Sequence, residues 1–197
     1  MMPKQTPSQT IGPFFAYGLT PEQYGYPFAS VATGQMADEA ATGELGGGER
    51  IRIIGRVLDG EGAAIGDALI ELWQADAQGR YAGAREAGRN AGFVGFGRQG
   101  TGADPDNRFI FDTIKPGAVD AEQAPHISVV VFMRGLLTHA YTRIYFSDEA
   151  EANARDPVLI TVPEQRRRTL VARQEADGIY RFDIHMQGDD ETVFFDV

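Results

Sequence analysis

From residue 50 onward, apolar and polar residues alternate with a period of two, and this pattern restricts the fold more than any other feature. Runs rich in Val, Ile, Phe and Tyr are separated by Gly, Pro, Asp or Asn, at 51–58, 68–75, 93–98, 108–114, 126–134, 139–146, 178–186 and 192–197. Many short strands with turn residues between them are typical of an all-β fold rather than a parallel sheet with crossover helices. We therefore predict an antiparallel β-sandwich over residues 50–197.

Two short helices are expected to interrupt the strands. One covers 148–154, with Ser147 as its N-cap, and the other covers 163–173. The second carries three consecutive arginines at 166–168. In an acidic chain such a cluster is expected to form a solvated face or to pair with carboxylates.

Residues 1–49 show neither helical nor strand periodicity, so we predict a long extended N-terminal arm. The arm is too aromatic for a disordered tail and should pack on the body of the protein or on a partner. Its aromatic residues are Phe14, Phe15, Tyr17, Tyr24, Tyr26 and Phe28.

Composition excludes several classes of function. The chain has 18 Lys and Arg against 28 Asp and Glu, a net charge of −10, which argues against binding nucleic acid or an anionic membrane surface. The absence of Cys excludes disulfides, zinc fingers, iron–sulfur clusters and thiol nucleophiles. No apolar run is long enough to span a membrane and no signal peptide is recognisable, so a cytoplasmic protein is expected.

Six phrases occur along the chain in a recognisable order: PSQTIGP (7–13), ELWQAD with GRY (71–81), TIKPG (113–117), APHIS (124–128), TRIYF (142–146) and YRFDI (180–184). Together they resemble the intradiol ring-cleaving dioxygenases, from about residue 6 to the C-terminal ETVFFD. The resemblance implies a β-sandwich, in agreement with the strand pattern.

In catalytically competent members of that family, two Tyr and two His hold a ferric ion. The matching positions here are Tyr81, Val119, His126 and Ser128, so one Tyr and one His are replaced by residues that are poor ligands or none. In addition, Gln123 and Arg143 replace an Arg and a Gln of the family pattern.

We therefore predict that this chain holds no metal and has no catalytic residue of its own. Tyr81 is expected to be a packed tyrosine with a hydrogen-bonded hydroxyl, and His126 to be a structural histidine.

The resemblance further implies a subunit role. In two-chain members, a homologous beta subunit holds Fe(III), and the other chain helps to form the substrate cavity in a hetero-oligomer of alpha-beta protomers. The positions that match the cavity-lining residues are Thr10, Gly12, Pro13 and Arg134. The implied substrate is protocatechuate, whose carboxylate suits an arginine. Alternatively, Gly12-Pro13 is a plain turn and Arg134 a turn residue before Gly135.

Two other functions are left open by the sequence. In the first, the chain is an enzyme on its own, a homo-oligomeric intradiol dioxygenase with a rearranged iron site. In the second, it is a noncatalytic sandwich-fold binding module. Val119 and Ser128 count against the first of these, while the Thr10–Pro13 segment and Arg134 favour the subunit role over the second.

Overall fold

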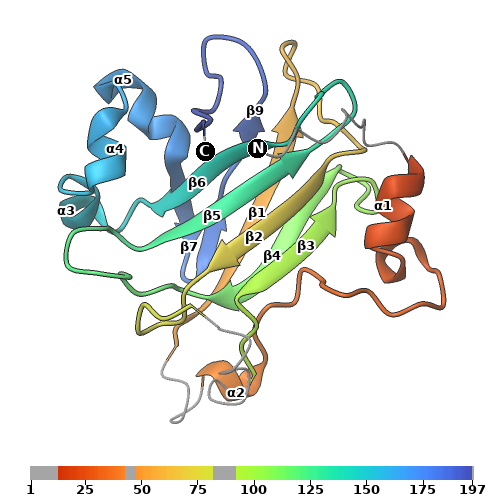
Figure 1. The fold of residues 1–197 in the computed structure, drawn as a ribbon, viewed down its shortest axis with the longest axis horizontal. Coiled ribbons are helices and arrows are strands. Elements are labelled where there is room, and N and C mark those ends of the chain that lie inside the picture. Colours follow the sequence, from red (N-terminus) through yellow and green to blue (C-terminus); the bar gives the residue numbers. More distant parts are fainter. Residues whose placement is uncertain (1–12, 43–47, 82–91, 197) are drawn as a thin grey trace, which may run out of the picture.

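A computed structural model describes residues 13–42, 48–81 and 92–196 of the chain (Figure 1). In these ranges the strands are β1 (Arg50–Leu58), β2 (Leu69–Gln74), β3 (Phe96–Gly100), β4 (Arg108–Ile114), β5 (His126–Phe132), β6 (Ala140–Phe146), β7 (Val171–Ala176), β8 (Ile179–Arg181) and β9 (Ile184–His185). They are hydrogen-bonded in the order β3-β2-β5-β6-β7-β8-β1-β4, and β9 pairs with β1. The predicted all-β fold class is confirmed.

The strands form two layers over a common core. One layer contains β3, β2, β5 and β6, and the other contains β8, β1 and β4. The apolar positions of the alternating strands face inward, and the core between the layers includes Ile51, Ile53, Ile70, Leu72, Phe109, Phe111, Ile127 and Val129. The strand β7 joins the layers, because its first residues pair with β6 and its later residues pair with β8.

Three strand pairings differ from the antiparallel arrangement that we expected. The pairs β1–β8, β1–β9 and β6–β7 are parallel, whereas β1–β4, β2–β3, β2–β5, β5–β6 and β7–β8 are antiparallel. Alternation fixes which face of a strand is buried but carries no information on its direction relative to its neighbour. The correction therefore concerns strand direction and not the fold class.

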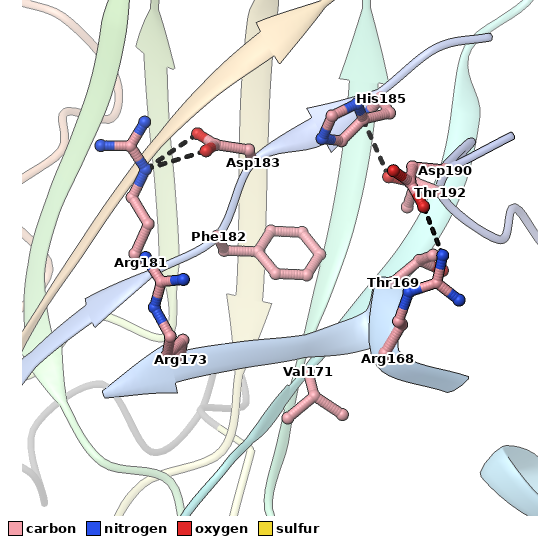
Figure 2. Close-up of a pocket in the computed structure, with 10 residues that line it drawn as sticks. All are labelled: Arg168, Thr169, Val171, Arg173, Arg181, Phe182, Asp183, His185, Asp190 and Thr192. Carbon is pink, nitrogen blue, oxygen red and sulfur yellow. Dashed lines mark hydrogen bonds and ion pairs between the residues drawn. The ribbon is translucent and has the colours of Figure 1, made fainter. Parts of the chain in front are cut away.

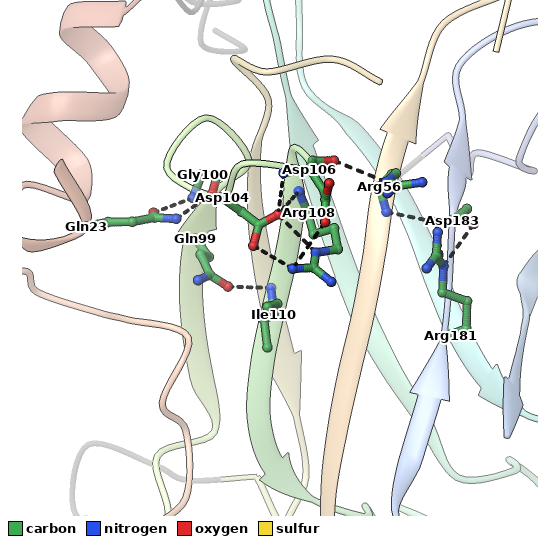
Figure 3. Close-up of polar contacts among 10 residues, drawn as sticks. All are labelled: Gln23, Arg56, Gln99, Gly100, Asp104, Asp106, Arg108, Ile110, Arg181 and Asp183. Carbon is green, nitrogen blue, oxygen red and sulfur yellow. Dashed lines mark hydrogen bonds and ion pairs between the residues drawn. The ribbon is translucent and has the colours of Figure 1, made fainter. Parts of the chain in front are cut away.

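The expected strand 178–186 is divided into β8 and β9 at Asp183. The carboxylate of Asp183 accepts hydrogen bonds from the backbone N–H of Arg56 and from Nε of Arg181, both at 2.9 Å (Figure 3). The chain also approaches β1 closely at this point, since a Cβ on Gly55 would lie 1.8 Å from the carbonyl oxygen of Phe182. A glycine in β1 is therefore required for the two segments to pack.

The helical segments are short: α1 (Pro13–Leu19), η1 (Glu22–Tyr24), α2 (Glu39–Thr42), α3 (Ala150–Asn153), α4 (Pro157–Thr161), α5 (Glu164–Arg167) and η2 (Arg168–Leu170). Figure 1 shows α3, α4 and α5 clustered on one side of the molecule and α1 on the opposite side. No helix in the described ranges is long and apolar enough to cross a bilayer.

Several predicted segment boundaries are wrong. The helix expected over 163–173 ends at Leu170, and β7 begins at Val171. Ser147 does not cap the helix α3; its hydroxyl instead accepts a hydrogen bond from the backbone N–H of Gln174 at 3.0 Å. The run 192–197 forms no strand up to residue 196 and contributes only an isolated bridge between Phe195 and Tyr141.

The predicted arm is not extended throughout, because α1, η1 and α2 lie within residues 13–42. It contacts the body through Met36, whose N–H donates to the carbonyl of Asp112 at 2.8 Å, and through Gln23, which bonds the backbone of Gly100 (Figure 3). Phe28 is 66% exposed and lines a cavity of about 460 Å³ with Tyr17, Pro21 and Tyr26 among others. The division of the chain into an arm and a body, and the burial of the arm against a homologous chain, stay predictions.

Candidate functional site

His126 and Ser128 lie on the outer face of the first layer, near the start of β5. The antiparallel register places His126 opposite Tyr145 and Ser128 opposite Arg143, and Ser128 also lies opposite Trp73 of β2. Directly opposite residues, and residues two apart on one strand, share a face of the sheet. The structure therefore brings two of the four remnant ligand positions together with Arg143.

His126 is buried, with 4% of its surface exposed. Its Nδ1 lies 2.9 Å from the carbonyl oxygen of Ala124, and since a carbonyl can only accept, Nδ1–H is the donor. Burial lowers the pKa of His126 because desolvation penalises the imidazolium, and the positive charge of Arg143 lowers it further. His126 thus has the buried, hydrogen-bonded surroundings of a structural histidine.

Arg143 is half-buried in the middle of this face. Its Nη1 lies 3.3 Å from Oε1 of Gln123 and 3.4 Å from the hydroxyl of Tyr145. Gln123 in turn donates from Nε2 to the carboxylate of Asp120 at 2.8 Å. Because a guanidinium is always protonated, a fixed positive charge stands beside Ser128.

Asp156 organises the same region and was missed by the sequence analysis. It is fully buried. Its Oδ1 accepts from the hydroxyl of Tyr145 at 3.0 Å and from the N–H groups of Val158 and Leu159 at 2.9 and 2.8 Å, and its Oδ2 accepts from the N–H of Ala124 at 2.9 Å. One carboxylate therefore joins β6, the start of α4 and the loop that leads to His126.

The sequence did contain a signal for this role. Asp156 is followed by Pro157, and Asp is a favoured N-cap while Pro is a favoured first helical residue. Burial also raises the pKa of Tyr145 to about 12, so that its hydroxyl stays protonated and donates to Asp156. The carboxylate of Asp156 is thus hydrogen-bonded both to the hydroxyl of Tyr145 and to the backbone N–H of Ala124.

Tyr81 and Val119 lie in two loops that pack together. Gly79 has a φ of +77°, and a Cβ on it would lie 1.9 Å from the carbonyl oxygen of Ala118, so only glycine allows this approach. Val119 is half-buried, whereas Tyr81 is 46% exposed. The expectation of a packed Tyr81 is therefore wrong, because nearly half of the residue is exposed.

The expected cavity-lining positions lie elsewhere. Thr10 and Gly12 are outside the described residues, and Pro13 is the first residue of α1. Arg134 follows the end of β5, at the opposite end of the strand from His126; its side chain is 76% exposed, and its Nε lies 2.8 Å from a carboxylate oxygen of Asp67. The structure does not bring Arg134 together with the remnant ligand positions.

The arginines at 166–168 mainly bond backbone carbonyls. Arg166 donates to the carbonyl of Glu191 at 2.7 Å, and Arg167 donates to that of Val162 at 2.9 Å. Arg168 pairs with Asp190. The cluster therefore holds the C-terminal segment against α5 and η2, which is more than the solvated face or ion-pair partner that the sequence suggested.

Comparisons with known proteins agree with this fold. A family model described as dioxygenase matches residues 24–188. The chain is 53% identical to a protocatechuate 3,4-dioxygenase alpha chain from Burkholderia cepacia over 98% of both chains. It is 35% identical to a protocatechuate 3,4-dioxygenase beta chain from Burkholderia cepacia, over 74% of this chain and 67% of that one. An intradiol ring-cleavage dioxygenase from Tetranychus urticae shares the fold with a TM-score of 0.57 and 15% identity, over 92% of this chain and 94% of that chain.

The chain belongs to the intradiol dioxygenase family. Within that family, its similarity to the Burkholderia alpha chain extends over nearly its whole length, and its similarity to the beta chain is lower and covers less of it.

Members of the intradiol family use non-haem iron, and the described residues do not suit a ferric ion. In the described ranges no group of three or more His, Asp or Glu side chains is placed to hold a metal. Val119 has no donor atom and the hydroxyl of Ser128 is a poor ligand, while the guanidinium of Arg143 beside it repels a cation. The face that matches the family's iron site thus carries a cationic side chain.

Proposed function

We propose that this chain is the noncatalytic alpha subunit of a protocatechuate 3,4-dioxygenase and acts with a homologous beta subunit that holds Fe(III). The assembly is a hetero-oligomer of alpha-beta protomers. It cleaves protocatechuate between its two hydroxyl-bearing carbons, and both atoms of O2 enter the product, 3-carboxy-cis,cis-muconate.

The single observation that carries this proposal is the 53% identity to an alpha chain over 98% of both chains. The charge at the remnant site supports it, because Arg143 stands opposite Ser128, the position of the second family histidine. A chain with this arrangement needs another subunit to supply the metal.

In this function the chain supplies shape and charge to the partner's substrate cavity. We assign this role to Thr10, Gly12, Pro13 and Arg134. Arg134 suits it because 76% of its side chain is exposed and only its Nε is engaged, by Asp67, among the described residues. A guanidinium presents several donors in a plane and is well matched to the carboxylate of protocatechuate.

The test separates the subunit role from its alternatives. The chain should be purified alone and together with its beta subunit, and iron content and ring cleavage should be measured for both. We expect no stoichiometric iron and no visible phenolate-to-iron charge-transfer band for the chain alone, and both iron and activity for the pair.

About one tightly held iron per isolated chain would contradict the proposal and support a homo-oligomeric enzyme. An active beta subunit whose turnover and substrate affinity do not change when this chain is added would instead support a binding module. A control preparation of the beta subunit alone distinguishes these outcomes.

A further inference from the structure

A second polar cavity lies away from the remnant ligand positions, where β7, β8, β9 and the C-terminal segment meet (Figure 2). Its volume is about 330 Å³. Figure 2 shows Arg173 and Arg181 at one end, Arg168 and His185 at the other, and the ring of Phe182 between them. The cavity therefore has two basic ends and an apolar middle.

Two arginines are cross-strand neighbours at the first end. Arg173 and Arg181 are directly opposite each other on the antiparallel strands β7 and β8. Like charges in this position destabilise a sheet. Three arginines line the cavity against two aspartates, although the whole chain has a net charge of −10. The lining thus holds more arginines than aspartates, in contrast to the chain as a whole.

Part of the donor capacity at this end is unused within the described residues. Asp183 bonds Arg181 only through Nε, at 2.9 and 3.0 Å, and it also accepts from the backbone N–H of Arg56. Asp183 therefore fixes the guanidinium of Arg181, whose side chain is 25% exposed, and leaves both Nη groups without a described partner. Arg173 uses only Nη2, in an exposed pair with Glu175.

At the other end Arg168 has two described partners, the carboxylate of Asp190 and the carbonyl of Gln165, to which its Nη1 donates. Arg168 pairs with Asp190, but both side chains are more than 60% exposed, at 61% and 62%. Such an exposed pair contributes little to the free energy of unfolding. The backbone N–H of His185 is bonded to the hydroxyl of Thr192, so the strand that presents the imidazole is fixed.

We propose that this cavity binds a small dicarboxylate or tricarboxylate. One carboxylate pairs with the Nη groups of Arg181 and with Arg173, another lies near Arg168 and His185, and the carbon skeleton lies over Phe182. Two basic ends separated by an aromatic ring favour an anion with separated carboxylates over a single-headed oxyanion. This site does not depend on the proposed role as an alpha subunit.

Isothermal titration calorimetry tests the site with the full chain in the assembled form in which it purifies. The probes are adipate, with two carboxylates, butyrate, with one, and inorganic phosphate, all at matched ionic strength. We expect adipate to bind about tenfold more tightly than butyrate, since each additional arginine–carboxylate contact is worth about that much in affinity.

Substitutions then locate the binding. Arg181→Gln and Arg173→Gln should each weaken adipate binding about tenfold or more. Arg155→Gln should not change it, because Arg155 is exposed and bonds the carbonyl of Glu151 outside the cavity. If Arg181→Gln does not fold, Arg173→Gln still decides, because its side chain is 74% exposed.

Three results would overturn the proposal. The first is equal affinity for adipate and butyrate, or none for either. The second is adipate binding that survives both cavity substitutions. The third is phosphate binding as tight as adipate binding, which would make the cavity a single-headed oxyanion site.

Discussion

The polar residues at the two ends of β5 differ in burial and in the number of their hydrogen-bond partners. At the first end His126 is 4% exposed, and the polar atoms around it are bonded to one another through Asp156 and Arg143. Beyond the other end, the side chain of Arg134 is 76% exposed and has one ion pair within the described ranges, to Asp67. Of the positions that match a metal site, His126 is thus part of the buried, hydrogen-bonded interior, whereas the cation beyond the other end of the strand is exposed.

This difference distinguishes side chains that contribute to the stability of the fold from side chains that contribute to binding. A buried group with several partners contributes mainly to the free energy of unfolding, because its loss leaves the partners unsatisfied away from water. An exposed group in a single ion pair contributes little to stability and can contribute much to binding. Substitutions at the two ends should therefore change different measured quantities.

The largest effect on stability is expected from Asp156→Ala. The change leaves the hydroxyl of Tyr145 and the N–H groups of Ala124, Val158 and Leu159 without their acceptor. Loss of a helix cap together with a buried hydrogen-bonded network should lower the free energy of unfolding by about 2–4 kcal/mol. Urea unfolding followed by circular dichroism measures this change.

Asp67→Ala is the matched control at the other end of β5. Asp67 faces the exposed Arg134, and its second carboxylate oxygen has no hydrogen-bond partner among the described residues. We expect a loss of about 1 kcal/mol or less. Similar losses for the two aspartates would show that the ends do not differ in this way.

Arg134→Leu should have its main effect on binding. In the alpha-beta assembly, we expect protocatechuate affinity to fall about tenfold to a hundredfold, because a charge-assisted hydrogen bond to the substrate carboxylate is lost. The free energy of unfolding should change by less than about 1 kcal/mol. Steady-state kinetics with protocatechuate and with catechol measure the difference between the substrates.

Catechol lacks the carboxylate and should be nearly indifferent to the substitution. Arg155→Gln serves as the control for removing an exposed arginine, since Arg155 bonds only the carbonyl of Glu151 among the described residues. Equal losses for both substrates, or no loss for either, would make Arg134 a turn residue before Gly135.

Most strands could be predicted from the sequence because successive side chains of a strand point to opposite faces of the sheet. Buried apolar residues therefore alternate with residues that face outward. In β5, Ile127, Val129 and Val131 are buried and the residues between them face outward, which is the pattern visible in the sequence. The strand β7 was missed because its exposed residues carry no alternation. Its place in the sheet depends on parallel pairing of Val171 with Tyr145, a long-range contact that local sequence does not encode.

For the candidate site, the sequence predicted which positions belong to it but not how their side chains are arranged. The phrases around His126 and Arg143 gave the residue types, and the strand register then placed these residues on one face. The role of Asp156 depends on partners from three separate segments, so it became visible only in the folded chain. Residue type alone predicts a packed Tyr81, whereas in the folded chain the residue is 46% exposed.

The smallest expected effect is a pH dependence at the buried end of β5. Burial lowers the pKa of His126 in the folded chain below its ordinary value of 6.5; the charge of Arg143 acts in the same direction, and the carbonyl of Ala124 and the carboxylates of Asp156 and Asp120 oppose it. Well above pH 6.5 the imidazole is neutral in both states and has no effect on stability. As the pH falls below that value, the unfolded chain binds a proton first, so the free energy of unfolding decreases until the folded-state pKa is passed.

His126→Gln should remove this dependence. Urea unfolding of both proteins from about pH 8 to about pH 5 measures it, because the two proteins differ only at position 126. The stability of the original chain relative to the variant should be constant well above pH 6.5 and should decrease as the pH falls through that value. A relative stability that does not change across this range would contradict the prediction, because it would show that burial does not lower the pKa of His126 in the folded chain.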